Sequence, residues 1–213
     1  MTRMARIAHD FVYLASQSPR RRQLLDQIGV RHELLLAGPE EDAEALEATV
    51  AGEPPAAYVE RVTRAKLAAA LDRLAARRLP IAPVLCADTT VVLGRAILGK
   101  PADAAEAASM LRRLSGRTHK VITAVAVAAP QPAHALPRVE LAVNTSSVRF
   151  AAIDASDIDR YVAGGEPFGK AGAYAIQSAA AAWIARIDGS YSAIMGLPLY
   201  ETAQLLKKAG VGF

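Results

Sequence analysis

Cysteine is almost absent from this sequence, which has one in 213 residues. The lone Cys86 excludes an internal disulfide and any zinc site built from several cysteines, and its apolar surroundings predict buried packing. No stretch approaches the roughly 20 uncharged apolar residues of a membrane-spanning helix, and residues 1–10 lack the apolar core of a signal peptide. We therefore expect a soluble, cytoplasmic protein with no membrane partner and a frayed segment 1–10.

Clustered positive charge is also missing. The net charge is +4 and the pI about 9.4, but the basic residues are spread along the chain, with no lysine-rich tail. Aromatic residues make up only 5% of the chain and do not alternate with the basic ones. Because nucleic-acid-binding surfaces need clustered basic residues, we expect no nucleic-acid partner, and a small polyanionic substrate fits the charge at least as well.

The hydrophobic content of 52% is enough for a sizeable core, and no linker or repeat divides the chain, so we expect one domain over residues 11–213. An apolar run at 11–15, a helix at 19–28 ended by Gly29 and a second apolar run at 30–36 predict a β-α-β opening. The remaining pattern predicts a mixed α/β fold with one large twisted sheet. Its expected helices begin at residues 54, 103, 154 or 156, and 198, and its strands cover 84–93, 96–98, 121–129, 139–150, 173–177 and 181–187.

The segment that joins the first strand to the first helix is suited to binding an anion. Ser18 followed by Pro19 is typical of a helix start, where backbone amides are free. Those amides, the helix dipole and the guanidinium groups of Arg20 and Arg21 would all stabilise a bound phosphate. The alternative is an ordinary capped helix with solvated arginines.

Asp88 interrupts the apolar run at 84–93 and is the best candidate for a catalytic residue. An ionised carboxylate is costly in a buried strand unless it is paired, bound to metal or placed in a pocket. The alternative is a structural aspartate that ends the strand or pairs with an arginine. Strand alternation puts Thr89 on the opposite face from Asp88, so both can line one site only if the strand ends or bulges there.

Two lysines and a glycine-rich segment complete the set of candidates. Lys100 lies between Gly99 and Pro101 after the expected hairpin, which suits a phosphate site but also an exposed turn. Lys66 lies beside the apolar stripe of the long helix and would point toward the sheet, although helical lysines are usually solvated. The glycine-rich residues 164–177 end at Gln177, whose amide could recognise a nucleobase. The four histidines have no metal-ligand spacing, so any metal would be a hard cation bound by carboxylates and substrate phosphates.

These segments, in this order, resemble the Maf family of nucleoside triphosphate pyrophosphatases, also called septum-formation inhibitors. The matching segments begin at residues 15 (ASQSPRR), 58 (YVERV), 87 (ADT), 99 (GKP), 114 (LSGRTH), 170 (KAGAYAIQ), 189 (GSY) and 196 (GLPL). The resemblance implies the fold of inosine triphosphate pyrophosphatases, an elongated mixed sheet flanked by helices with two lobes around a cleft. It also implies a homodimer that splits a nucleoside triphosphate into a monophosphate and pyrophosphate with a divalent cation, Mg²⁺ or Mn²⁺.

The resemblance also assigns roles to individual residues. It implies that Asp88 is the catalytic base and that Glu41 is the acidic residue on the metal side, where Asp88 is a second ligand. The implied phosphate-binding cations are Arg21, Lys66 and Lys100. We also expect substrate contacts from five further polar residues of the matched segments, Ser16, Ser18, Arg20, Thr89 and Gln177.

Three of these positions separate the branches of the family. Arginine, threonine and glutamine at Arg20, Thr89 and Gln177 are similar to the branch that acts on dTTP and UTP. The family also contains a branch that acts on 7-methyl-GTP and carries other residues there. A second alternative is a nucleotide sensor without catalytic activity that regulates cell division.

Overall fold

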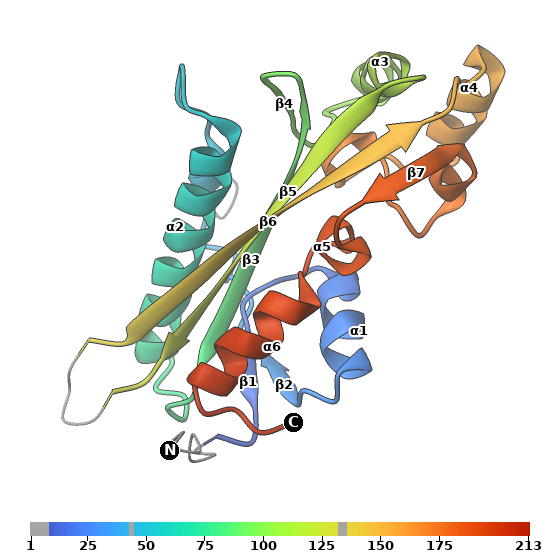
Figure 1. Cartoon of the computed structure of the whole chain (residues 1–213). Helices are drawn as coiled ribbons and strands as arrows, with labels where there is room; N and C mark the ends of the chain where they lie inside the picture. The colour runs from blue at the N-terminus through green and yellow to red at the C-terminus, as the bar shows by residue number, and fades with distance from the viewer. Residues whose placement is uncertain (1–8, 43–44, 132–135) are drawn as a thin grey trace.

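The structure is a computed structural model that describes residues 9–42, 45–131 and 136–213 (Figure 1). Its strands are β1 (Val12–Leu14), β2 (His32–Leu34), β3 (Val84–Leu93), β4 (Ala96–Leu98), β5 (Thr118–Ala129), β6 (Arg138–Phe150) and β7 (Ile184–Asp188). Its α-helices are α1 (Pro19–Gln27), α2 (Pro55–Ala76), α3 (Ala104–Leu114), α4 (Ala155–Ala163), α5 (Tyr191–Met195) and α6 (Leu199–Lys208). Short 3₁₀ turns are η1 (Ala45–Glu47), η2 (Ala171–Ala173) and η3 (Ala179–Trp183).

The seven strands form one mixed sheet in the order β2-β1-β3-β5-β6-β7, and β4 pairs with β3 beside this path. Strand β1 is parallel to both β2 and β3, whereas the other pairs are antiparallel. The predicted α/β fold class and β-α-β opening are therefore confirmed, and the strands predicted at 121–129 and 139–150 form the long antiparallel pair β5–β6.

The helices cover the two faces of the sheet unequally. Helix α2 lies along one face of β3 and β5, and α1, α5 and α6 lie on the other side (Figure 1). The sides of β3 follow the strand alternation: Cys86 packs with Leu67 of α2, whereas Leu85 belongs to the core cluster of α1 and α6. Asp88, two residues after Cys86, therefore faces α2.

Cys86 itself is buried, as its apolar surroundings predict, and burial raises the pKa of its thiol to about 12. The thiol is therefore protonated and unreactive near neutral pH.

Local sequence rules explain most helix boundaries. The Asp103 side chain accepts a hydrogen bond from the Glu106 amide at 2.8 Å and so caps α3 as predicted. Gly29, with a φ of 72°, adopts the left-handed conformation just after the C-terminus of α1 and so ends that helix as predicted. Ser18 stands at the N-cap of α1, but its side chain makes no capping hydrogen bond.

The strand predicted at 173–177 is wrong. Gly172 and Ala173 have φ values of 68° and 63°, so the chain turns through η2 where a strand would need extended residues. The strand predicted at 181–187 is partly wrong, because η3 occupies its first residues and β7 begins only at Ile184. The short helix α5 was not predicted at all.

Three segments lie outside the described residues: residues 1–8, which belong to the segment expected to be frayed at 1–10, and residues 43–44 and 132–135. Just after the first of these, His9 forms a parallel bridge with Val211, and Asp10 forms an ion pair with Arg31 at 2.8 Å. Among the helices that the structure describes, none has the length and apolar character that crossing a membrane requires.

Candidate active site

A cleft of about 1030 Å³ opens along the middle of β3, between α2, the start of α1 and the turns at 99–100 and 169–177. Every residue that the sequence selects for catalysis, substrate or metal lines this cleft. These residues are Ser16, Ser18, Arg20, Arg21, Glu41, Lys66, Asp88, Thr89, Lys100 and Gln177. Segments from both ends of the chain therefore meet at one place.

Asp88 and Thr89 both reach the cleft although β3 neither ends nor bulges between them. Strand β3 pairs with β5 in unbroken register from Val84 to Val92. On its other edge β1 pairs only as far as Leu85, and β4 begins pairing only at Val91. The cleft lies beside the unpaired stretch of edge between these two partners, and Asp88 and Thr89, from opposite faces of the strand, both line it. The condition set from the sequence, an end or a bulge, was therefore wrong.

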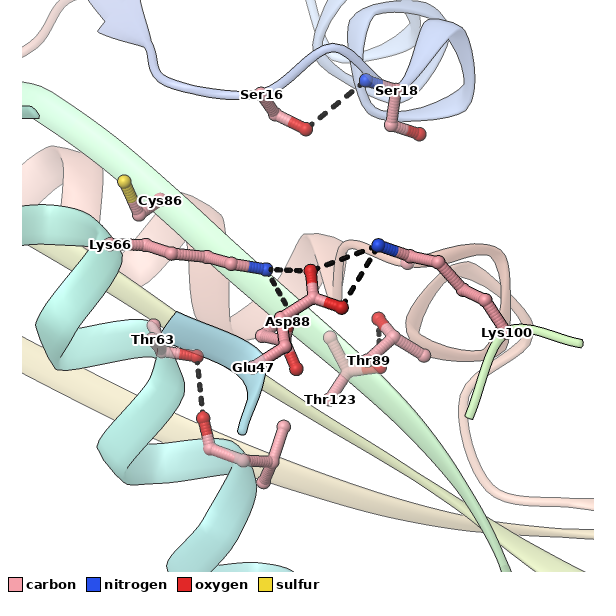
Figure 2. A network of polar contacts seen from close by, with 12 residues as sticks. Ser16, Ser18, Glu47, Thr63, Lys66, Cys86, Asp88, Thr89, Lys100 and Thr123 are labelled. Carbon is pink, nitrogen blue, oxygen red and sulfur yellow. Dashed lines mark hydrogen bonds and ion pairs between the residues drawn. The ribbon is translucent and has the colours of Figure 1, made fainter. Parts of the chain in front are cut away.

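A network of four charged side chains lies at the centre of the cleft (Figure 2). Lys66 Nζ from α2 donates to Asp88 Oδ1 and to Glu47 Oε1, both at 2.7 Å. Lys100 Nζ approaches Glu47 from the other side and donates to Oε1 at 3.0 Å and to Oε2 at 2.9 Å. The two lysines are thus held by two carboxylates, and Glu47 contacts both lysines.

Each member of this network stabilises the charge of its neighbours. Burial opposes the charged Lys66 ammonium, but the nearby carboxylates of Asp88 and Glu47 outweigh burial and raise the pKa of Lys66. Burial likewise opposes the charged Glu47 carboxylate, but Lys66 and Lys100 outweigh it and lower the pKa of Glu47. Both shifts favour the charged forms of Lys66 and Glu47.

The arginines at the start of α1 form a second positive region. Arg21 Nε donates to the Gly196 carbonyl at 2.8 Å, and its Nη1 donates to Ser16 Oγ at 3.0 Å. Arg20 Nε donates to the Met195 carbonyl at 3.3 Å. Burial lowers the pKa of both guanidinium groups. Neither arginine forms an ion pair with any carboxylate in the described part of the chain, so this region attracts anions.

Glu41 lines the cleft, but its carboxylate is bound by Arg73 and by the Gly38 amide. Arg73 donates to Glu41 Oε1 at 2.7 Å and forms a second, shorter hydrogen bond to Oε2, while the Gly38 amide donates to Oε1 at 3.0 Å. The Arg73 hydrogen bond is the main cause that lowers the pKa of Glu41 to about 2.

The structure therefore brings Glu47, and not Glu41, into the network with Asp88. Sequence reasoning gave Glu47 no role. Five acidic residues lie between positions 40 and 47, and nothing in their spacing singles out the last one.

Thr89 and Gln177 occupy the far side of the cleft from α2. Thr89 Oγ1 lies 2.9 Å from Thr123 Oγ1, which in turn donates to the Ala193 carbonyl at 2.8 Å. Gln177 follows η2 and has an exposed side chain on a turn, where the sequence predicted the end of a strand.

The cleft wall that carries Gln177 is supported by a buried aromatic group. His119 Nε2 lies 2.7 Å from the hydroxyl of Tyr174, and both rings pack edge-on against Phe150. Burial lowers the pKa of His119 to about 4, so the imidazole is neutral. His119 therefore supports Tyr174, which itself lines the cleft.

Comparisons with known proteins agree with this arrangement. The family model described as Maf-like protein matches residues 11–209. The chain is 60% identical over 204 residues to a protein of Polaromonas sp. (strain JS666 / ATCC BAA-500). The aligned residues cover 96% of the chain and 98% of that relative. It is 61% identical over 206 residues to a protein of Burkholderia pseudomallei (strain 1710b), with 97% of each covered. Both relatives are named dTTP/UTP pyrophosphatase.

Proposed function

The chain belongs to the Maf-like protein family and is a nucleoside triphosphate pyrophosphatase, and we propose that its cleft hydrolyses dTTP and UTP to the monophosphate and pyrophosphate. The observation that carries the proposal is the cleft itself, where a carboxylate at an open strand edge lies among four cations. A triphosphate with about four negative charges needs positive groups on several sides. Arg20, Arg21, Lys66 and Lys100 supply them.

Asp88 acts as the general base in this proposal. Its carboxylate accepts a hydrogen bond from Lys66 at 2.7 Å and lines the cleft, where a bound water molecule would give up its proton to it. Arg21 and Lys100 stabilise the negative charge that grows on the phosphates as the bond to the leaving pyrophosphate breaks.

The residues of the cleft fit a divalent cation of the Mg²⁺ or Mn²⁺ type. Within the described ranges, no group of three or more His, Cys, Asp or Glu side chains could bind a metal by itself. Mg²⁺ usually binds through one or two carboxylates plus substrate phosphates, and Asp88 with a second acidic residue meets that need. Glu41 is the second residue by family resemblance, and Glu47 by proximity to Asp88. When bound, such a cation offsets phosphate charge and lowers the pKa of coordinated water.

Base selection falls to Gln177 with Arg20 and Thr89. The Gln177 amide offers one acceptor and one donor, which matches the N3–H and O4 that thymine and uracil share. Ser16 and Ser18 contact the phosphates from the start of α1, where the free Ser18 hydroxyl and the α1 amides face the cleft.

Two properties accompany this function in our proposal. The enzyme is a homodimer, and it works in the cytoplasm without nucleic-acid or membrane partners. Sedimentation of the purified protein tests the dimer.

The experiment that tests the proposed function measures pyrophosphate release with Mg²⁺ or Mn²⁺ from dTTP, UTP, CTP, GTP and 7-methyl-GTP. We expect the highest kcat/KM for dTTP and UTP, and a weaker preference in Gln177→Glu because a carboxylate cannot donate to O4. A preference for 7-methyl-GTP would favour the other branch of the family. Nucleotide binding without any pyrophosphate release would favour the sensor of cell division.

A further inference from the structure

Glu47 occupies the lysines that the proposed function assigns to substrate phosphates. Among the described residues, Lys100 Nζ donates two hydrogen bonds, both to the Glu47 carboxylate, and Lys66 Nζ donates one to Glu47 and one to Asp88 (Figure 2). An ammonium group has three donors, so most of the hydrogen-bonding capacity of these lysines is already used. A phosphate group that binds both lysines must take the place of the Glu47 carboxylate or share the lysines with it.

The position of Glu47 is built into the fold. The Tyr58 hydroxyl of α2 donates to the Glu47 carbonyl at 2.9 Å, and Arg61 Nη2 donates to the next carbonyl, that of Ala48, at 2.9 Å. These two contacts hold the backbone of the segment against α2. The Glu47 side chain remains 26% exposed, so the side chain can leave the lysines while the backbone stays in place.

The charge of the entering nucleotide determines whether the Glu47 side chain leaves the lysines. A metal-free triphosphate that enters the cleft brings its negative charges next to Glu47 and Asp88, which are close enough to bind the same ammonium. Such like charges repel strongly in a partly desolvated cleft. A divalent cation carried on the phosphates offsets two of these charges and provides a positive partner for the displaced carboxylate.

We propose, on the basis of the proposed function, that Glu47 is a specificity-determining residue which restricts the cleft to nucleotides complexed with a divalent cation. The Glu47 carboxylate stays bound to Lys66 and Lys100 when a metal-free nucleotide approaches. It releases both lysines when the phosphates arrive with their cation. Its removal should therefore improve the binding of the metal-free nucleotide, although it removes two ion-pair contacts from the free protein.

The test measures binding, independently of turnover. Calorimetry gives the Kd of the non-hydrolysable analogue α,β-imido-dUTP, with excess Mg²⁺ and with EDTA, for the wild type, Glu47→Gln and Glu60→Gln. Glu60 is a matched control because it is a glutamate on α2 whose only ion pair among the described residues is an exposed one with Arg64. We expect Glu47→Gln to bind the analogue in EDTA at least about tenfold more tightly than the wild type does. We expect Glu60→Gln to match the wild type in both conditions.

Two results would overturn the inference. An unchanged Kd in EDTA would show that Glu47 does not exclude metal-free nucleotides, and weaker binding in both conditions would make Glu47 a residue that positions the lysines. Glu47→Ala, checked for folding by circular dichroism, separates the loss of charge from any new contact of glutamine. A wild type that fails to bind the analogue even with Mg²⁺ would instead contradict the proposed function on which the inference rests.

Discussion

Asp88 is the residue on which the proposed chemistry depends, because it is the carboxylate that β3 presents at its open edge. Its hydrogen-bond partner Lys66 comes from a different element, so Asp88→Asn removes the proton acceptor while the strand pairing with β5 remains. We expect a folded variant whose kcat falls by a factor of about 10² or more. Steady-state kinetics on dTTP, with the exposed Asp72→Asn as control, provide the measurement. Near-normal turnover in folded Asp88→Asn would rule out the general-base role.

The cations around Asp88 should each contribute separately to transition-state binding. We expect Arg21→Ala, Lys66→Ala and Lys100→Ala each to lower kcat/KM for dTTP, because each removes a charged donor from the phosphates. The decrease should correspond to a loss of about 1.5–4 kcal/mol in transition-state binding. Lys120→Ala, an exposed lysine on β5, should leave kcat/KM unchanged. A cleft variant with unchanged kcat/KM would mean that its residue does not bind substrate.

His119 makes stability depend on pH. The folded pKa of about 4 lies below the ordinary value of 6.5, so the unfolded chain binds a proton that the folded chain does not bind between these pH values. Stability from this residue is therefore complete above pH 6.5 and is lost as the pH falls toward 4. Between pH 8 and pH 5 we expect a loss of about 2 kcal/mol in the free energy of unfolding. Urea titrations should show a loss smaller by this amount in His119→Gln, whereas equal losses would contradict the shift.

Sequence patterns predicted the helices and strands whose boundaries are set by their own residues. Helix α3 has its cap at Asp103, and the hairpin β3–β4 has Gly94 at its turn, so both were predicted to within a residue. The segment at 173–177 was mistaken for a strand because a short apolar run is typical of a buried strand. Its apolar residues are buried by tertiary packing without forming one. Its course depends on the amide of Gly172, which donates to the Gly99 carbonyl at 3.0 Å. Residues so distant in sequence give no local signal of this contact.

Gly172 is more sensitive to substitution than another left-handed glycine because it packs closely against Val91. A Cβ at Gly172 would lie 2.8 Å from Val91 Cγ1, whereas one at Gly29 meets nothing within 4 Å, although both have a positive φ. We expect Gly29→Ala to cost about 1–2 kcal/mol from backbone strain, and Gly172→Ala to cost about 1–3 kcal/mol more from the clash. Thermal or urea unfolding of the two variants measures the difference. Equal costs would show that the η2 segment is not packed closely on β3.

At the scale of the whole molecule, the cleft combines segments whose proximity follows from the sheet order. The motifs at Ser16, Asp88, Lys100 and Gln177 were identified from their residue types and family resemblance, and all of them line the cleft. The open edge of β3 could not be predicted, because it depends on how far β1 and β4 extend along that strand. The place of Glu47 could not be predicted either, since it depends on how α2 holds the preceding segment through Tyr58.

The central claim is that this cleft directs water to the α-phosphorus of a pyrimidine nucleoside triphosphate. Hydrolysis of dTTP in H₂¹⁸O with Mg²⁺, followed by mass spectrometry of the products, tests it most directly. The account predicts equal amounts of dTMP and pyrophosphate, with the ¹⁸O label on the phosphate of dTMP and no label in the pyrophosphate. Formation of dTDP and orthophosphate, or label in the pyrophosphate, would contradict it.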